Sequence, residues 1–281
     1  MEPQSLNTAA KNTWCPGCGN FAILNAVKSV LLDLEKEGTP REKIVLVSGI
    51  GCHAKIADYL AVNSFYSIHG RVAPVAQGIK FARPELAVAG FAGDGDGYGE
   101  GLEHLLFAAK RNADITMIIH NNRVYGLTTG QYTPTSPLGF QGRSTPRGSR
   151  EVPLNPLNLL LASGATFLAR GYSNRLDSLK FILRQAFGHR GFALVDVLQV
   201  CVTFFNLYEF YNRQVYEMKD HDPGDSEAAR KKILEWDYNS ADRPIPLGVF
   251  YRTEKPDFTP SEEKPALSSA EREAEIDRVL A

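Results

Sequence analysis

The sequence has little cysteine, no long apolar run and no excess of charge of either sign. Four cysteines in 281 residues are too few for a disulfide-stapled scaffold. In a reducing compartment they are available for metal binding or catalysis. The 31 basic and 32 acidic residues leave a net charge of −1 without a basic stripe. We therefore expect no nucleic-acid partner.

The chain also lacks the segments that would place it in or across a membrane. No apolar stretch approaches the length needed to span a bilayer, so we expect no membrane partner. The opening residues, MEPQSLNTAAKNTW, contain no apolar core of a secretion signal, and we expect a cytoplasmic location. What is present is the composition of a globular protein, with 43% hydrophobic and 22% charged residues.

Apolar runs alternate with helical spacings along the chain as far as about residue 200. We expect strands at 43–51, 85–97, 114–122, 165–170 and 192–200. We expect helices at 20–38, 53–63, 70–84, 99–113, 154–163 and 175–188. The strands are apolar throughout, which is typical of a parallel sheet that is covered on both faces. The sequence therefore predicts an α/β fold with a mostly parallel sheet and helices on both faces.

The segment after residue 202 differs in composition. Residues 204–220 are aromatic and polar, and 226–237 have the pattern of a helix. Residues 258–269 are polar and contain proline, which suits an extended arm. We expect 1–202 to form the domain that carries the site. We expect 203–281 to form helices and an arm that pack on it or on a partner subunit.

The second predicted strand runs into a glycine-rich turn, AGDGDGYGEG at 92–101. Its glycines allow close approach of the backbone to a ligand, and the following helix N-terminus favours phosphate. Asp94 and Asp96 would repel a phosphate unless a divalent cation such as Mg²⁺ lies between them. The pattern is neither a Walker loop nor the dinucleotide fingerprint. A surface turn with capping aspartates remains the alternative.

Asn122 lies 28 residues after Asp94, at the polar end of the next predicted strand. One helix and one strand separate the two residues, so both lie at the carboxyl ends of neighbouring parallel strands. The Asn122 side chain and the backbone carbonyl of Val124 would supply neutral oxygen ligands to the same cation. An ordinary asparagine-rich turn is the alternative.

The cysteine pair in CPGC, Cys15 and Cys18, fits a redox dithiol, half of a zinc site or half of an iron–sulfur site. The other two, Cys52 and Cys201, follow the first and last predicted strands and can reach the same edge of the sheet. The spacing matches no common zinc ribbon and no compact ferredoxin run. Buried structural cysteines are the alternative on the residues alone.

The GDG turn followed by a strand ending in NN resembles the thiamine diphosphate signature. In order, WCPGCGN, GIGCHAKI, HGRVAPVAQGIKFARP, GDGD, NNRVYGLTTGQYTPT and DVLQVCVTF resemble the β subunit of 2-oxoacid:ferredoxin oxidoreductases. The similarity spans residues 12–252, and the ending PIPLGVFYR is similar to the 2-oxoglutarate and broad 2-oxoacid branches. It implies a thiamine diphosphate-binding fold.

The resemblance also implies residue roles. Asp94, Asn122 and Val124 would hold Mg²⁺, and Cys15, Cys18, Cys52 and Cys201 would bind one [4Fe–4S] cluster. The residues expected to line the thiamine cofactor are Ile50, Gly51, Cys52, His53, His69, Gly95, Asp96, Gly126 and Leu127. Lys55 matches a lysine that holds the substrate carboxylate, a role that suits its charge. An exposed helical lysine and a capping histidine are the alternatives for Lys55 and His69.

The implied activity is oxidative decarboxylation of a 2-oxoacid, with 2-oxoglutarate as first choice. Coenzyme A collects the acyl group, CO₂ leaves and ferredoxin takes the electrons, and the reverse direction would fix CO₂. The activating glutamate comes from a partner α subunit in this family, so we expect an αβ pair, doubled to a heterotetramer. Glu100 and Glu103 are then ordinary residues of a helix's first turns.

One departure from the family pattern concerns the substrate. Thr129 stands where many members carry lysine, which leaves a pyruvate-specific member open as an alternative to 2-oxoglutarate. A non-redox thiamine decarboxylase would keep Asp94 and Asn122 but has no use for four cysteines. A zinc-stabilised binding protein would use the cysteines and leave the GDGD and NN turns unexplained.

Overall fold

One mixed sheet organises the chain, and its strand order places the predicted site. The computed structural model describes residues 6–259 and 267–280. Within them, eight strands form a sheet in the order β2-β1-β3-β4-β6-β5-β8-β7. The strands are β1 Ile44–Ser48, β2 Asn63–Tyr66, β3 Ala87–Gly93, β4 Thr116–Asn121, β5 Phe167–Tyr172, β6 Ala193–Leu198, β7 Val215–Glu217 and β8 Ile245–Arg252. Every neighbouring pair is parallel except β5 and β8, which confirms the mostly parallel sheet.

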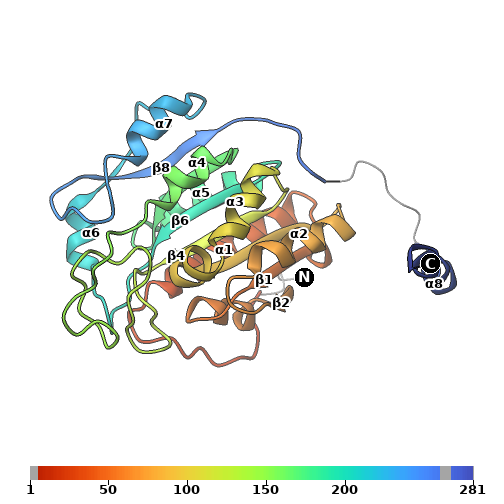
Figure 1. The fold of residues 1–281 in the computed structure, drawn as a ribbon, viewed down its shortest axis with the longest axis horizontal. Coiled ribbons are helices and arrows are strands. Elements are labelled where there is room, and N and C mark those ends of the chain that lie inside the picture. Colours follow the sequence, from red (N-terminus) through yellow and green to blue (C-terminus); the bar gives the residue numbers. More distant parts are fainter. Residues whose placement is uncertain (1–5, 260–266, 281) are drawn as a thin grey trace.

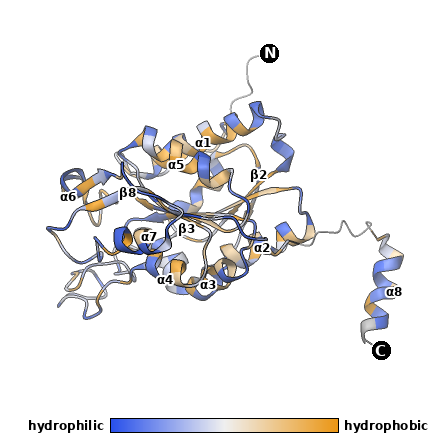
Figure 2. Ribbon diagram, turned by 90° about the horizontal axis from the view of Figure 1, so that it is seen from above, coloured by the Kyte–Doolittle hydropathy of each residue, from blue (hydrophilic) through white to orange (hydrophobic). Residues whose placement is uncertain are grey.

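Helices cover both faces of the sheet, as Figures 1 and 2 show. They are α1 Asn20–Lys36, α2 Val72–Ala82, α3 Leu102–Lys110, α4 Pro156–Ala162, α5 Leu176–Phe187, α6 Tyr208–Gln214, α7 Ser226–Ile233 and α8 Ser269–Leu280. Helices α1 and α5 lie on one face, and α2, α3, α4 and α7 lie on the other. In α5 the buried residues Leu179, Ile182, Leu183 and Ala186 follow the 3.6-residue period. These two apolar layers confirm the α/β fold.

The C-terminal segment adds to the same sheet. Strand β8 pairs with β5 in antiparallel register, so the chain returns from α7 to the body of the sheet. Trp236 and Tyr238 are fully buried, in a third apolar cluster with the end of β6. The boundary near residue 202 stays a prediction. Most of the predicted arm, at 260–266, lies outside the described residues. No helix in the described part of the chain is both long and apolar enough to cross a membrane.

Two predicted helices are present but differ from the prediction in type or in extent. Residues 53–63 form a 3₁₀ helix, His53–Tyr59, and then enter the edge strand β2, whose four side chains are all exposed. Such a short solvent-facing strand has no apolar alternation from which to predict it. In place of an α-helix from residue 99, Gly95–Glu100 form a π-helical turn before α3 begins at Leu102. Its glycines disfavour regular helix, and π-helical turns are frequent at functional sites.

Candidate active site

The carboxyl ends of four neighbouring strands carry the candidate residues. Strands β1, β3, β4 and β6 are adjacent in the sheet and run in the same direction. Cys52 follows β1, Asp94 follows β3, Asn122 follows β4 and Cys201 follows β6. The predicted convergence at one edge of the sheet is therefore present.

All residues predicted to contact the thiamine cofactor or Mg²⁺ line one pocket at this edge. The pocket is lined by Ile50, Gly51, Cys52, His53, His69, Gly93, Asp94, Gly95, Asp96, Asn122, Val124, Tyr125, Gly126, Leu127 and Thr128. Its volume in this chain is only about 60 Å³. A pocket that encloses a cofactor-sized ligand has roughly 300–1,000 Å³. The pocket of this chain by itself is therefore too small to enclose a ligand of that size.

Asp94 is a buried carboxylate without a basic partner in the described part of the chain. Its Oδ2 accepts a hydrogen bond from the Thr135 hydroxyl at 2.8 Å, and its Oδ1 accepts one from the Asn122 backbone at 3.3 Å. No salt bridge joins it to a basic side chain within residues 6–259 and 267–280. Burial raises the pKa of Asp94 to about 6, although hydrogen bonds from Thr133 and Thr135 oppose the rise. A buried carboxylate in this state fits a divalent cation.

The turn after β4 brings Asn122 and Val124 to the same pocket through a strained residue between them. Arg123 has a φ of +62°, a left-handed conformation that costs a non-glycine residue on the order of 1–3 kcal/mol. Its buried guanidinium donates through Nε to the Thr135 carbonyl at 2.8 Å and through Nη2 to the Tyr238 carbonyl. These contacts hold the turn in place, with Asn122 and Val124 both facing the pocket.

Asp96 is also buried and lies against two histidines. Its Oδ1 accepts a hydrogen bond from the Gly70 backbone at 2.8 Å and lies 3.1 Å from His69 Nδ1. His53 Nε2 is 3.3 Å from Asp96 Oδ2, but neither atom makes a hydrogen bond among the described residues. A side chain at Gly49 would place its Cβ 1.9 Å from Asp96 Oδ2, so only glycine fits there. The two predicted aspartates thus differ, because imidazoles lie against Asp96 and hydroxyls lie against Asp94.

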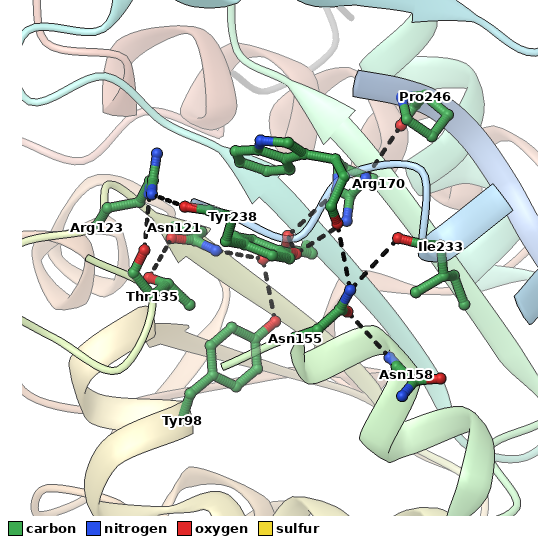
Figure 3. Close-up of polar contacts among 12 residues, drawn as sticks. Tyr98, Asn121, Arg123, Thr135, Asn155, Asn158, Arg170, Ile233, Tyr238 and Pro246 are labelled. Atoms are coloured by element: carbon green, nitrogen blue, oxygen red, sulfur yellow. Dashed lines mark hydrogen bonds and ion pairs between the residues drawn. The ribbon is translucent and has the colours of Figure 1, made fainter. Parts of the chain in front are cut away.

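A buried network connects the turn after β4 to the C-terminal segment, and Figure 3 shows Asn121, Thr135, Arg170 and Tyr238 within it. Asp196 accepts hydrogen bonds from Asn121, Tyr98 and Tyr238 at 2.6–3.1 Å. Arg170 Nε is 3.6 Å from Asp196 Oδ2, and both side chains are fully buried. The side-chain oxygen of Asn121, Oδ1, lies 3.0 Å from the Thr135 hydroxyl, which contacts Asp94. The site is thus supported from the centre of the sheet.

The four cysteines gather beside the pocket. Cys52 Sγ and Cys201 Sγ lie 3.6 and 3.7 Å from the position that a Cβ on Gly126 would occupy. Burial raises the pKa of the Cys18 thiol to about 12, and the charges of Cys201, Cys52 and Cys15 add to the rise. Cys15 is exposed and the other three are half-buried. In the described residues, no three His, Cys, Asp or Glu side chains converge closely enough to hold a single metal ion.

The comparisons with known proteins agree with this geometry. Residues 49–197 match the family "Thiamine pyrophosphate enzyme, C-terminal TPP binding domain". Residues 201–264 match the family of C-terminal segments of the pyruvate ferredoxin oxidoreductase β subunit. Over 261 residues the chain is 43% identical to 2-oxoacid:ferredoxin oxidoreductase 1, subunit beta, of Aeropyrum pernix, covering 88% of this chain and 80% of that protein. This chain belongs to the 2-oxoacid:ferredoxin oxidoreductase β subunits.

Two further relatives carry 2-oxoglutarate in their names. The 2-oxoglutarate oxidoreductase subunit KorB of Mycobacterium tuberculosis is 46% identical over 191 residues, or 68% of this chain and 50% of that one. A solved 2-oxoglutarate:ferredoxin oxidoreductase from Magnetococcus marinus, with 2-oxoglutarate, coenzyme A and succinyl-CoA bound, superposes with a TM-score of 0.85. The two chains are 33% identical, and the match covers 100% of this chain and 91% of the Magnetococcus marinus chain.

Membership of this oxidoreductase family supports thiamine diphosphate as the cofactor of the pocket. An α subunit is implied by the name of the β-subunit relatives. The individual roles of Asp94, Asn122 and the four cysteines remain predictions that the geometry accommodates. Lys55 lies close enough to Cys52 for its charge to oppose the rise in the pKa of that thiol, which burial causes. Its ammonium donates to the Thr13 hydroxyl at 3.0 Å.

Sequence reasoning missed several residues that the β-subunit fold brings to the site. Tyr125 closes over the glycine turn, and its hydroxyl donates to the Gly95 carbonyl at 3.2 Å and lies 3.1 Å from Glu100 Oε1. Thr135 holds Asp94 from 41 residues away in the sequence. Only the NNRVY run, in which Tyr125 closely follows the asparagines, gave a local signal.

A cavity larger than this pocket lies away from it, at the opposite end of the strands. Its volume is about 790 Å³, and its lining includes Asp114, Arg190, Arg252 and Asp257. None of the predicted site residues lines it, and two of its charged residues, Arg190 and Asp257, form an ion pair at 2.6 Å. Volume alone is therefore a poor guide to the active site of this chain.

Proposed function

We propose that this chain binds thiamine diphosphate, Mg²⁺ and a [4Fe–4S] cluster and oxidises a 2-oxoacid, 2-oxoglutarate first, in complex with an α subunit. The products are acyl-coenzyme A and CO₂, and ferredoxin receives the electrons. The observation that carries the proposal is Gly126, which borders the pocket and lies against the sulfurs of Cys52 and Cys201. The site of decarboxylation and the site of electron exit are then neighbours.

Different pocket residues would contact different parts of the cofactor. Asp94, the Asn122 side chain and the Val124 carbonyl would hold Mg²⁺ against the diphosphate, and the nearby turn leaves room because its glycines carry no side chains. Ile50, Leu127 and His69 would contact the rest of the cofactor. Thiamine diphosphate supplies the electron sink for decarboxylation when it is bound. The chain itself would bind and orient the cofactor and exclude water from it.

The cysteine set fits a cluster by its donor chemistry. Thiolates are the ligands of iron–sulfur clusters, and a cluster is wider than the single ion for which these side chains are too far apart. Burial raises the pKa of the Cys18 thiol to about 12, so cluster binding there would have to displace the thiol proton. Cys15 is exposed, so the cluster would lie next to the surface where ferredoxin can approach.

A partner chain is needed to complete the pocket. The volume of about 60 Å³ falls far below that of a thiamine-sized ligand, so a second wall must close over it. Ile50 and Leu127 are 36% and 48% exposed beside the pocket. We propose that both side chains are covered by an α subunit, which provides the activating glutamate and forms an αβ pair that doubles to a heterotetramer.

Two side chains bear on the choice of substrate. Lys55 would hold the carboxylate at C1 of the 2-oxoacid. Thr129 replaces a family lysine, yet the guanidinium of Arg143 donates to the Thr129 hydroxyl at 2.6 Å. A cation is therefore still present near this turn, which favours a dicarboxylic substrate over pyruvate. Pyruvate remains the second candidate.

The test is anaerobic co-purification with the α subunit, followed by a panel of 2-oxoacids with coenzyme A. We expect 2-oxoglutarate to be preferred and ferredoxin to be reduced. Cys201→Ser should retain thiamine diphosphate binding but lose ferredoxin reduction, because it removes one cluster ligand. Unimpaired ferredoxin reduction by Cys201→Ser would show that the cluster assignment is wrong. Zinc in place of iron in anaerobic protein would favour the binding-protein alternative.

A further inference from the structure

Gln199 connects the proposed metal site to the proposed cluster. It follows β6 directly, is 1% exposed and donates its backbone N–H to the Asn121 carbonyl at 2.9 Å. Its side-chain Oε1 accepts a hydrogen bond from Asn122 Nδ2 at 2.9 Å. Its Nε2 donates to the Val200 carbonyl at 2.6 Å and to Cys18 Sγ at 3.4 Å. Both N–H bonds and the carbonyl of this amide are thus in use.

The Val200 carbonyl fixes which way the Gln199 amide points. If the amide were reversed, two oxygens would face each other at 2.6 Å, and neither could donate a hydrogen bond. Oε1 must therefore point at Asn122. Asn122 then presents its NH₂ group to Gln199, and its Oδ1 accepts a hydrogen bond from the Val124 N–H at 3.1 Å. An amide oxygen has two lone pairs, so Oδ1 keeps one that could bind a cation.

The loop that carries Cys15 and Cys18 packs against Gln199 and Val200. The Gly19 N–H donates to the Val200 carbonyl at 3.1 Å, which places the residue after Cys18 on the end of β6. A Cβ on Gly19 would lie 3.1 Å from Gln199 Cγ and 2.8 Å from the Val200 nitrogen. Glycine at this position lets the loop come close enough for the bond from Gln199 to Cys18.

We propose that Gln199 is a positioning residue for both cofactor sites. It orients Asn122 toward Mg²⁺ and raises the reduction potential of the cluster by donating a hydrogen bond to the Cys18 sulfur. Hydrogen bonds to ligand sulfurs stabilise the reduced cluster, because reduction increases the negative charge there. The inference rests on the proposed function, since it assumes that both groups bind at these residues.

The first test is Gln199→Met in the αβ complex, which keeps the volume and removes all three hydrogen bonds. We expect the dissociation constant for thiamine diphosphate at fixed Mg²⁺, measured by calorimetry, to rise about tenfold. We expect the equilibrium constant for cluster reduction to fall up to about tenfold, which is about 59 mV for one electron. Redox titration followed by electron paramagnetic resonance measures it.

Gln77→Met is the matched control. Gln77 is also buried, at 8% exposure, but its side chain donates to the Ala73 carbonyl of its own helix, away from both proposed cofactor sites. Gln77→Met should change neither the dissociation constant for thiamine diphosphate nor the reduction potential of the cluster. An equal effect of both substitutions would show that loss of a buried amide, and no particular contact of Gln199, is responsible, and would overturn the proposal.

Gln199→Glu separates the two roles and remains informative if the methionine variant does not fold. A protonated glutamic acid can donate to the Val200 carbonyl and accept from Asn122 but has no donor left for Cys18. We expect thiamine diphosphate affinity within threefold of wild type and a lowered cluster potential. An unchanged potential, or loss of cofactor affinity alone, would overturn the proposal. If wild type binds no cluster or no thiamine diphosphate, the proposed function itself fails.

Discussion

Asp94→Asn should make the cofactor-free protein more stable while abolishing its cofactor binding. In the structure the carboxylate is 1% exposed, and hydroxyl and backbone groups are the partners that hold it. An amide at this position can accept from the Asn122 backbone and donate its NH₂ to the Thr135 hydroxyl. Thr135 then donates its single proton to the side-chain oxygen of Asn121, Oδ1, 3.0 Å away. The substitution therefore removes a buried charge and leaves these polar groups paired.

The magnitude follows from the pKa of Asp94, which burial raises from 3.8 to about 6. A raised folded-state pKa means that stability from this group is complete below pH 3.8 and is lost as the pH rises to about 6. At 1.36 kcal/mol per pKa unit, the loss at pH 7 is about 3 kcal/mol. Asp94→Asn should therefore gain about 3 kcal/mol at pH 7 and roughly half as much at pH 5.

The assay is urea unfolding of anaerobic protein freed of Mg²⁺ and thiamine diphosphate, at both pH values. Asp242→Asn makes the same chemical change at an exposed position and should alter stability by less than about 0.5 kcal/mol. The reasoning is refuted if Asp94→Asn is no more stable than wild type at pH 7. A gain of the same size at both pH values would also refute it, because titration would not be its cause.

The remaining predictions concern the cofactor, the glycine cradle and the buried ion pair. Because Mg²⁺ needs the ionised carboxylate, the apparent affinity of wild type for Mg²⁺ and thiamine diphosphate should fall tenfold per pH unit below about pH 6, as calorimetry would show. Gly49→Ala should cost about 1–3 kcal/mol in urea unfolding, since its Cβ would lie 1.9 Å from Asp96 Oδ2, whereas Gly78→Ala meets no atom within 4 Å and should be neutral or stabilising. Arg170→Met should cost about 3–5 kcal/mol by leaving Asp196 charged and buried, and adding Asp196→Asn should recover part of the loss.

The sequence predicted the residues that line the site better than the residues that hold them in position. Asp94 and Asn122 could be found because each directly follows an apolar strand, and parallel strands bring such positions together. Gln199 could not, because its contacts with Asn122 and Cys18 join residues 77 and 181 positions apart. The strained conformation of Arg123 also depends on distant carbonyls, at Thr135 and Tyr238.

The fold shows the same division. Strands β1, β3, β4, β5 and β6 were predicted because burial on both faces makes them continuously apolar. The edge strand β2 was missed because all of its side chains are exposed. The antiparallel pairing of β8 with β5 joins two segments whose order in the sheet no local pattern encodes. The local pattern of apolar residues therefore predicts most of the strands, whereas long-range packing determines which strands lie next to each other in the sheet.

The central claim is that electrons leave the thiamine site through a cluster bound by the four cysteines. The most direct measurement is low-temperature electron paramagnetic resonance of the anaerobic αβ complex, frozen after mixing with 2-oxoglutarate and coenzyme A. The account predicts the signal of a reduced [4Fe–4S] cluster in wild type and its absence in Cys201→Ser, with thiamine diphosphate still bound in both. Decarboxylation by wild type without any reduced iron signal, or an unchanged signal in Cys201→Ser, would contradict the claim.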